Sequence, residues 1–217
     1  MEGALEAVVA KRPHAALAAA DRVLAELMAE VGELDLEHRR RGRPKGNAYS
    51  NLLRTVIGQQ LSTRAARTIH ERVLAIYGGR EPAPEELLDT DDAELRAAGL
   101  SGRKVEYLRS LAEHVVSGEL ETGRLEELPD DEVIAEITAV RGLGEWSAHM
   151  FLMFFLERPD VLPTGDLGIR RAVQIRYGLD DLPAAEELER IAEPWRPHRT
   201  LACVHLWESL HNQPAQA

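Results

Sequence analysis

Helical periodicity is the feature that most constrains the fold of this chain. Apolar residues recur every three to four positions along most of the 217 residues, which is the spacing of a buried helix face. No persuasive segment alternates between apolar and polar residues as a half-buried strand does, and no repeat of fixed length occurs. The sequence therefore predicts an all-α protein of ten or eleven helices, arranged as two packed helical subdomains with a cleft between them.

Caps and glycines set the expected helix bounds. The first clear helix is expected from His14 to near Gly32, and Ser62 is expected to cap another that runs to Gly78. Between them, residues 36–46 read as a basic loop because proline and glycine interrupt the pattern. The remaining helices are expected at residues 49–58, 81–88, 90–99, 101–118, 130–139, 145–156 and 166–177, with two more within 184–210.

Composition excludes several classes of protein. Hydrophobic residues make up 44% of the chain, which is typical of a folded protein. No run of about eighteen apolar residues occurs, so a membrane-spanning helix is not expected. Cys203 is the only cysteine, which excludes an internal disulfide, a cysteine-rich zinc site and a four-cysteine cluster. The histidines form neither H-E-x-x-H nor another dense ligand group, which argues against a metal hydrolase.

The charge is unevenly distributed. The chain carries a formal charge of -11. Residues 1–80 hold 13 Lys and Arg against 9 Asp and Glu, whereas residues 81–136 hold 5 against 17. Salt screens repulsion beyond about 8–10 Å, so a polyanion can still meet a locally basic face. The first fourteen residues lack the cationic leader of a secretory signal, which predicts a cytoplasmic protein, associated with the nucleoid if the source is bacterial.

A glycine hairpin precedes an apolar helix in the stretch RGLGEWSA. Gly142 and Gly144 are expected to adopt backbone conformations that other residues resist, and to clear side chains from the tip. An anion would then reach the N–H groups at the start of the following helix. The alternative is a tight turn between packed helices without a ligand.

An aspartate follows the helix after the hairpin. In VLPTGDLGIRRAV, Asp166 is expected to cap the next helix, which would hold its carboxylate in a defined direction. Capping alone is the simpler interpretation. Asp166 lies twenty residues after Trp146, however, separated by one helix and one loop, so the chain can bring both to one cleft.

Together these stretches resemble the helix–hairpin–helix superfamily of DNA base-excision glycosylases, and more particularly its alkylpurine branch of the 3-methyladenine DNA glycosylase II type. Three further motifs occur in the order of that branch: RTVIGQQLSTRAA (Arg54–Ala66), GLSGRKVEYLRSLA (Gly99–Ala112) and RPHRTLACVHLW (Arg196–Trp207). The similarity begins near Tyr49. It implies a bilobal all-α fold, DNA binding through the hairpin, and hydrolysis of an N-glycosidic bond by Asp166 without a required cofactor.

The resemblance also implies roles for residues that surround a flipped nucleotide. Gln60, with Leu61 as its neighbour, matches the wedge that fills the gap in the duplex. The base pocket would comprise Trp146, Trp207, Met150 and Leu167. Relatives have aromatic residues where Met150 and Leu167 stand, so this pocket is expected to be less aromatic. A helix-surface role for Gln60 and core packing for the tryptophans are the alternatives.

Further positions are implied to contact the DNA backbone, namely Gly142, Leu143, Gly144, Arg103 and Lys104. The backbone carbonyls of Thr138, Val140 and Leu143 match positions that hold a structural monovalent cation in relatives. The densest basic run, residues 39–45, is more simply a solvated loop. Exposed cations on a helix surface are likewise the simpler account of Arg103 and Lys104.

The expected chemistry is that of a monofunctional hydrolase. Bifunctional relatives carry a lysine nucleophile where this chain has Trp146, so no lyase activity is expected. Asp166 would stabilise an oxocarbenium-like transition state and orient or deprotonate the attacking water. The expected partner is double-stranded DNA that contains alkylated bases, bound by a monomer, with no membrane involved. The alternatives are a helix–hairpin–helix module that binds DNA without catalysis, and a helical protein unrelated to DNA.

The expected domain organisation has three parts. Residues 1–48 would form an N-terminal helix and basic loop that pack with the C-terminal lobe. Residues 49–159 would form a central subdomain that carries the hairpin, and residues 160–217 a C-terminal lobe that begins near the catalytic aspartate. An additional N-terminal β domain, found in some bacterial relatives, is not expected because too little chain precedes the matched region.

Overall fold

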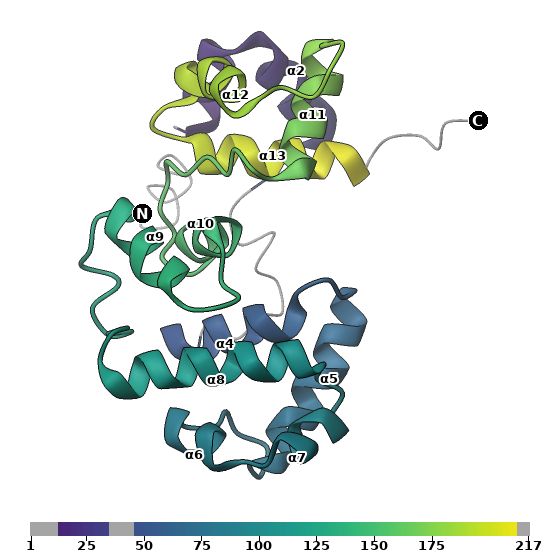
Figure 1. Cartoon of the computed structure of the whole chain (residues 1–217). Helices are drawn as coiled ribbons and strands as arrows, with labels where there is room; N and C mark the ends of the chain where they lie inside the picture. Colours follow the sequence, from purple (N-terminus) through teal and green to yellow (C-terminus); the bar gives the residue numbers. More distant parts are fainter. Residues whose placement is uncertain (1–12, 35–45, 212–217) are drawn as a thin grey trace, which may run out of the picture. The chain divides into compact units, whose positions relative to one another are not determined.

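A computed structural model describes residues 13–34 and 46–211, and within these ranges every regular element is a helix (Figure 1). The all-α prediction is therefore confirmed. The basic run at residues 39–45 lies outside the described residues. Residues 13–20 are helical, and the further helices are α2 (Arg22–Val31), α4 (Ala48–Gly58), α5 (Thr63–Ile76), α6 (Pro84–Asp89), α7 (Asp92–Ala97), α8 (Gly102–Ser117), α9 (Asp130–Ala139), α10 (Glu145–Phe154), α11 (Leu167–Tyr177), α12 (Ala185–Ala192), the short 3₁₀ helix η1 (Glu193–Trp195) and α13 (Arg199–His211).

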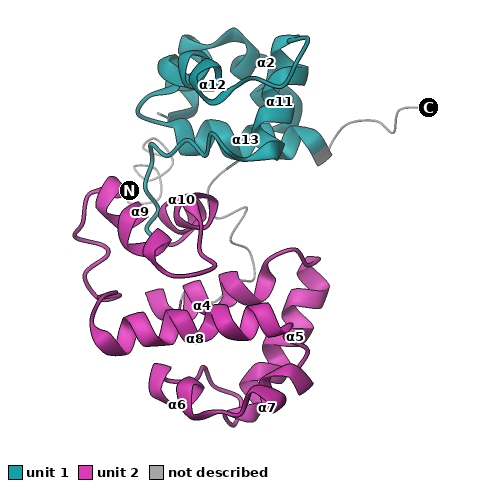
Figure 2. Ribbon diagram, viewed as in Figure 1, with its two compact units in different colours: residues 1–43, 156–217 teal, residues 44–155 magenta. Residues whose placement is uncertain are grey.

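The chain divides into two compact units (Figure 2). One unit consists of residues 44–155, and the other combines residues 1–43 with residues 156–217. The hairpin belongs to the first unit and Asp166 to the second. No helix among the described residues is long and apolar enough to cross a membrane.

The unit of residues 44–155 is organised around α8. This helix packs against α4, α6 and α7, while α5 packs on α4, and α9 packs on α10. Leu52, Val56, Leu108 and Leu111 are fully buried at the interior of this unit, as expected for apolar residues at helical spacing. Arg109 ties the α6–α7 connection to α8, because its guanidinium donates to the Leu88 carbonyl at 2.8 Å and to the Thr90 carbonyl at 2.7 Å.

The second unit contains α2, α11, α12 and α13. Helix α13 packs against both α2 and α11, and its buried side chains include Cys203, Val204 and Leu206. Thr200 in its first turn accepts a hydrogen bond at 3.0 Å from the N–H of Val161, which lies in the loop between α10 and α11. This contact fixes the loop that leads to Asp166.

The expectation of a single helix from His14 to Gly32 is wrong. Residues 13–20 and 22–31 are helical, but Asp21 between them has an extended backbone with φ -145° and caps α2. One carboxylate oxygen accepts from the N–H groups of Val23 and Leu24. The other accepts from the Tyr177 hydroxyl at 2.6 Å and the Trp195 indole at 2.8 Å. These long-range donors favour a cap where local periodicity predicts a continuous helix.

Candidate functional site

The connection between α9 and α10 is a tight turn built around Gly142. Its φ of +92° lies in the region that favours glycine. A Cβ atom at this position would lie 2.2 Å from Cγ of Tyr107 on α8, so there is no room for a side chain. Gly144 differs, because its φ of -100° is ordinary and nothing lies within 4 Å of a built Cβ. The expectation of an unusual backbone is right for Gly142 and wrong for Gly144.

The tip of this hairpin presents the start of α10. Gly144 is the N-cap and supplies no side chain to cap the helix. The first N–H groups of a helix have no partner within it, and the helix dipole makes this end favourable for an anion. Leu143, only 3% exposed, anchors the turn, and its N–H donates to the Val140 carbonyl at 3.0 Å. The Leu143 N–H, assigned to the DNA backbone from sequence, is therefore already engaged in the turn.

Gln59 connects the hairpin to the turn between α4 and α5. Its Nε2 donates to the carbonyl of Gly142 at 2.7 Å, across 83 residues of sequence. Sequence reasoning passed over Gln59 in favour of its neighbour Gln60. The available signal was the repeated glutamine in GQQ, since only one of two adjacent side chains can point inward at a helix end.

Lys104 supports the same turn from α8. Its Nζ donates to the Ile57 carbonyl at 2.6 Å, at the C-terminal end of α4 where the helix dipole favours a cation. Burial lowers the pKa of this half-buried lysine. The simple account of Lys104 as an exposed surface cation is therefore wrong, whereas Arg103 is exposed.

The predicted wedge residues lie in this α4–α5 turn. Gln60 has a φ of +59°, unusual for a residue with a side chain, and it is exposed. A residue held in this left-handed region costs on the order of 1–3 kcal/mol, and such residues concentrate at functional sites. Leu61 is also exposed, although it is a large apolar residue. The wedge assignment stays a prediction, and the exposure of both side chains is compatible with it.

Trp146 and Met150 lie one turn apart on α10. The Trp146 side chain is 48% exposed, which excludes core packing as the reason for a tryptophan at this position. Met150 is half-buried. The two side chains lie on neighbouring positions of one helix face. In the unit of residues 44–155, the hairpin, the exposed turn and this tryptophan are thus all carried by α4, α9 and α10.

Asp166 caps α11 and is held by two donors. Its Oδ1 accepts from the Ile169 N–H at 2.8 Å and from the Trp207 indole Nε1 at 2.9 Å. Trp207 lies on α13 and is 8% exposed. The sequence offers pocket lining and core packing as alternatives for Trp207. The structure shows a third role, because the indole donates to the candidate catalytic carboxylate and orients it. Leu167, the next residue, is 64% exposed.

Gly168 makes this contact possible. A Cβ atom there would lie 3.0 Å from the Asp166 Oδ1 and 3.1 Å from two atoms of the Trp207 indole. Its backbone is an ordinary helix position, so the glycine serves close approach and not an unusual φ. Sequence reasoning missed Gly168, although a glycine in the first turn of a helix directly after a capping aspartate is a usable signal.

Cys203 on α13 is a buried residue close enough to Asp166 to be influenced by its charge. The residue is fully buried, and burial, with a smaller effect of the Asp166 charge, raises the pKa of the thiol. A protonated thiol is a poor nucleophile, so Cys203 is a packing residue. Among the described residues, no group of three or more His, Cys, Asp and Glu side chains is placed to hold a metal ion.

The site residues thus form two groups. Asp166, Leu167, Gly168 and Trp207 belong to the unit that contains residues 156–217, and the hairpin, the α4–α5 turn and Trp146 belong to residues 44–155. Each group is internally well defined by the contacts above. The meeting of Trp146 and Asp166 in one cleft stays a prediction.

A packed helix–hairpin–helix with a glycine turn, followed by a capped aspartate, defines the class of helix–hairpin–helix DNA-repair proteins. The family model described as "HhH-GPD superfamily base excision DNA repair protein" matches residues 53–197. The chain belongs to this family.

Three similar proteins are named 3-methyladenine DNA glycosylases or glycosidases. The chain is 37% identical over 171 residues to DNA-3-methyladenine glycosylase 1 of Schizosaccharomyces pombe, covering 78% of this chain and 75% of the relative. The structure of the S. pombe 3-methyladenine DNA glycosylase in complex with abasic DNA matches with a TM-score of 0.82 and 32% identity, over 95% of this chain and 100% of that chain. A DNA-3-methyladenine glycosidase from Bacillus halodurans matches with a TM-score of 0.70 and 36% identity, over 88% and 90%. The resemblance to 3-methyladenine DNA glycosylases is confirmed.

Proposed function

We propose that this protein is a monofunctional DNA glycosylase that flips alkylated purines, of the 3-methyladenine and 7-methylguanine class, out of duplex DNA and hydrolyses the N-glycosidic bond. The observation that carries the proposal is the carboxylate of Asp166, fixed by the Ile169 N–H and the Trp207 indole in a chain of the base-excision family. The names of the relatives favour this enzyme over a non-catalytic DNA-binding module.

The chemistry follows from charge. An alkylated purine is already cationic, so it leaves as a neutral base and needs little protonation. As the bond to the base breaks, positive charge develops on the sugar, and a fixed carboxylate stabilises that charge and orients or deprotonates the attacking water. Asp166 supplies this carboxylate. Because a tryptophan occupies position 146 where lyases have a lysine, no Schiff base forms and the reaction ends with hydrolysis.

DNA binding is proposed to centre on the hairpin. The first N–H groups of α10 would bind a backbone phosphate, the exposed Gln60 or Leu61 would fill the gap left by the flipped nucleotide, and the protein would act as a monomer. The last turn of α9 also offers carbonyls without an intrahelical donor. Thr138, Val140 and Leu143 would hold a structural monovalent cation there, whose charge would bridge the hairpin to a phosphate.

The test is base release from methylated duplex DNA. Wild-type protein should release 3-methyladenine and 7-methylguanine, and Asp166→Asn should lose nearly all release while keeping its DNA affinity. Asp181→Asn is the matched control, because Asp181 is exposed and lies in the loop after α11. Equal release by wild type and Asp166→Asn would remove Asp166 from the chemistry. A covalent adduct after borohydride treatment of wild type would overturn the assignment as a hydrolase without lyase activity.

A further inference from the structure

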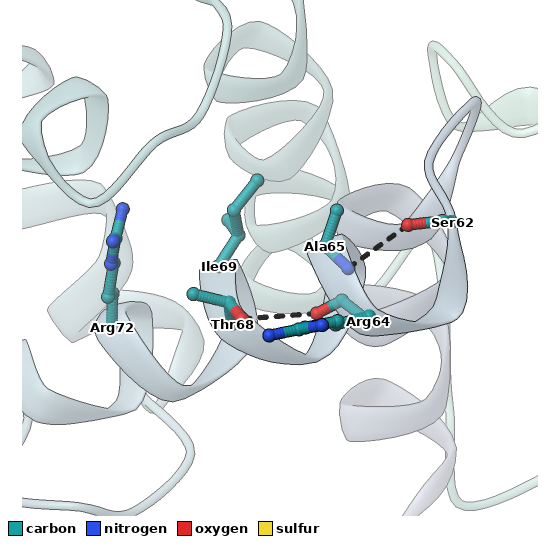
Figure 3. A pocket seen from close by; sticks show the side chains of 6 residues that line it. All are labelled: Ser62, Arg64, Ala65, Thr68, Ile69 and Arg72. Atoms are coloured by element: carbon teal, nitrogen blue, oxygen red, sulfur yellow. Dashed lines mark hydrogen bonds between the residues drawn. The ribbon is translucent and has the colours of Figure 1, made fainter.

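Helix α5 begins directly after the exposed turn that carries Gln60 and Leu61, and one of its faces is hollowed. The hollow is lined by Ser62, Arg64, Ala65, Thr68, Ile69 and Arg72 (Figure 3). Arg64, Thr68 and Arg72 are spaced by four residues, so they lie on one face of the helix on three successive turns. Both arginines are exposed.

The charge of this region is opposite to that of the whole chain. Residues 48–76 contain four arginines and one acidic residue, Glu71, in a protein with a net charge of -11. A positive segment in an acidic protein is a local field that attracts a polyanion at distances shorter than the screening length of about 8–10 Å.

The arginines of α5 also differ from five others in the same unit. Five arginines there form ion pairs with carboxylates, namely Arg54 with Glu81, Arg80 with Glu86, Arg109 with Asp92, Arg124 with Glu136 and Arg141 with Glu106. Arg64 and Arg72, like Arg67, Arg96 and Arg103, form no ion pair with any residue in the described ranges 13–34 and 46–211. Two guanidinium groups are therefore available on one face, although the unit as a whole has an excess of carboxylates.

We infer that this face of α5 is a second binding site for the DNA backbone, in which Arg64 and Arg72 contact two phosphates of the duplex beside the gap that the α4–α5 turn fills. The inference rests on the proposed function and adds a contact outside the hairpin. Arginine suits this role because its planar fork of donors matches the oxygens of a phosphate.

The spacing defines two separate contacts. Eight residues of helix rise place the two Cα atoms about 12 Å apart along the axis, whereas successive phosphates of one strand advance about 3.4 Å along the duplex axis. The two guanidinium groups therefore reach phosphates several nucleotides apart. Thr68 and Ala65 between them are small, so the DNA backbone can approach the helix over that distance.

The experiment measures the affinity for a duplex that contains an abasic-site analogue as a function of salt. Each lost phosphate contact reduces the slope of log K against log salt by about 0.9. The double variant Arg64→Ala/Arg72→Ala should reduce the slope by about 1.8. If wild type and variant bind equally well at 1 M salt, the variant should bind about tenfold more weakly at 0.1 M salt for each contact that it has lost. Arg64→Lys/Arg72→Lys should keep the slope, because the charges remain.

Arg80→Ala is the matched control, since it removes one exposed positive charge of the same unit that pairs with Glu86. Its slope should equal that of wild type. An unchanged slope in Arg64→Ala/Arg72→Ala, or a decrease of about 0.9 in the single-charge control Arg80→Ala, would refute the site. The base-release rate at saturating enzyme separates the two proposals. Wild type that binds through α5 but releases no methylated base would refute the proposed activity alone, whereas release with an unchanged salt slope would refute the α5 site alone.

Discussion

Replacement of Gly142 by alanine should destabilise the unit of residues 44–155 more than any other single methyl group added to the hairpin. Two costs combine. A residue with a side chain at a φ of +92° costs about 1–2 kcal/mol. The new Cβ would also lie 2.2–2.5 Å from Cγ and both Cδ atoms of Tyr107. These atoms are next to Cβ of Tyr107, so the ring can move away only if the Tyr107 backbone shifts or its side chain changes rotamer. Overpacking of this kind adds about 1–3 kcal/mol.

The expected loss of unfolding free energy is therefore about 2–5 kcal/mol. Hydrogen exchange of the amides in α8, α9 and α10 measures it within the unit concerned, so two-state unfolding of the whole chain need not be assumed. Gly144→Ala is the control, because its φ is ordinary and the Cβ meets nothing within 4 Å. Its cost should stay below about 1 kcal/mol, from a poorer N-cap.

A thermodynamic cycle with Tyr107→Ala separates the two costs. In the Tyr107→Ala background the ring is absent, so Gly142→Ala should cost only the backbone penalty of about 1–2 kcal/mol. If Gly142→Ala costs the same with and without the ring, then the contact with Tyr107 is not the reason for glycine at this position.

Three further predictions concern contacts that the sequence did not reveal. Gln59→Leu removes the donor to the Gly142 carbonyl, so it should cost about 1 kcal/mol of unfolding free energy and weaken DNA binding; DNA affinity equal to wild type would show that the hairpin needs no such support. Gly168→Ala should slow single-turnover base release about tenfold or more, since displacement of the Trp207 indole removes a hydrogen bond to a charged group worth about 1.5–3 kcal/mol; an unchanged rate would separate the indole from catalysis. Burial lowers the pKa of His205 from its ordinary 6.5, so the folded state favours the neutral ring. The stabilising contribution of the neutral ring is present above about pH 6.5 and is lost as the pH falls toward the lowered pKa. His205→Gln should flatten the pH dependence of the unfolding free energy between pH 7.5 and 5.5, and an identical pH dependence in both proteins would contradict this.

The direction of the His205 effect has a structural cause. Its Nε2 accepts from a backbone N–H of Leu34 at 3.3 Å, and its Nδ1 lies 3.0 Å from the Leu201 carbonyl. A ring that accepts at Nε2 and donates at Nδ1 is neutral. Protonation would place a donor against a donor, next to the ring of His14 at a centroid distance of 5.3 Å.

The sequence by itself determined the features that depend on local chemistry. Helical periodicity, the caps at Ser62 and Asp166, and the glycine hairpin all involve residues within a few positions of one another. Their order along the chain was also sufficient to identify the family. Such features are readable because the hydrogen bonds and the buried face of a helix are set within three to four residues.

Only the tertiary structure decided which distant side chains bond to one another and so hold helix ends and site residues in place. At a helix end, Asp21 interrupts a periodic helix because Tyr177 and Trp195, more than 150 residues away, donate to it. Gln59 reaches the hairpin across 83 residues, and Trp207 reaches Asp166 across 41. The physical reason is that a side-chain donor costs free energy when it is buried without an acceptor, and only the packing of distant helices determines which acceptor is within reach.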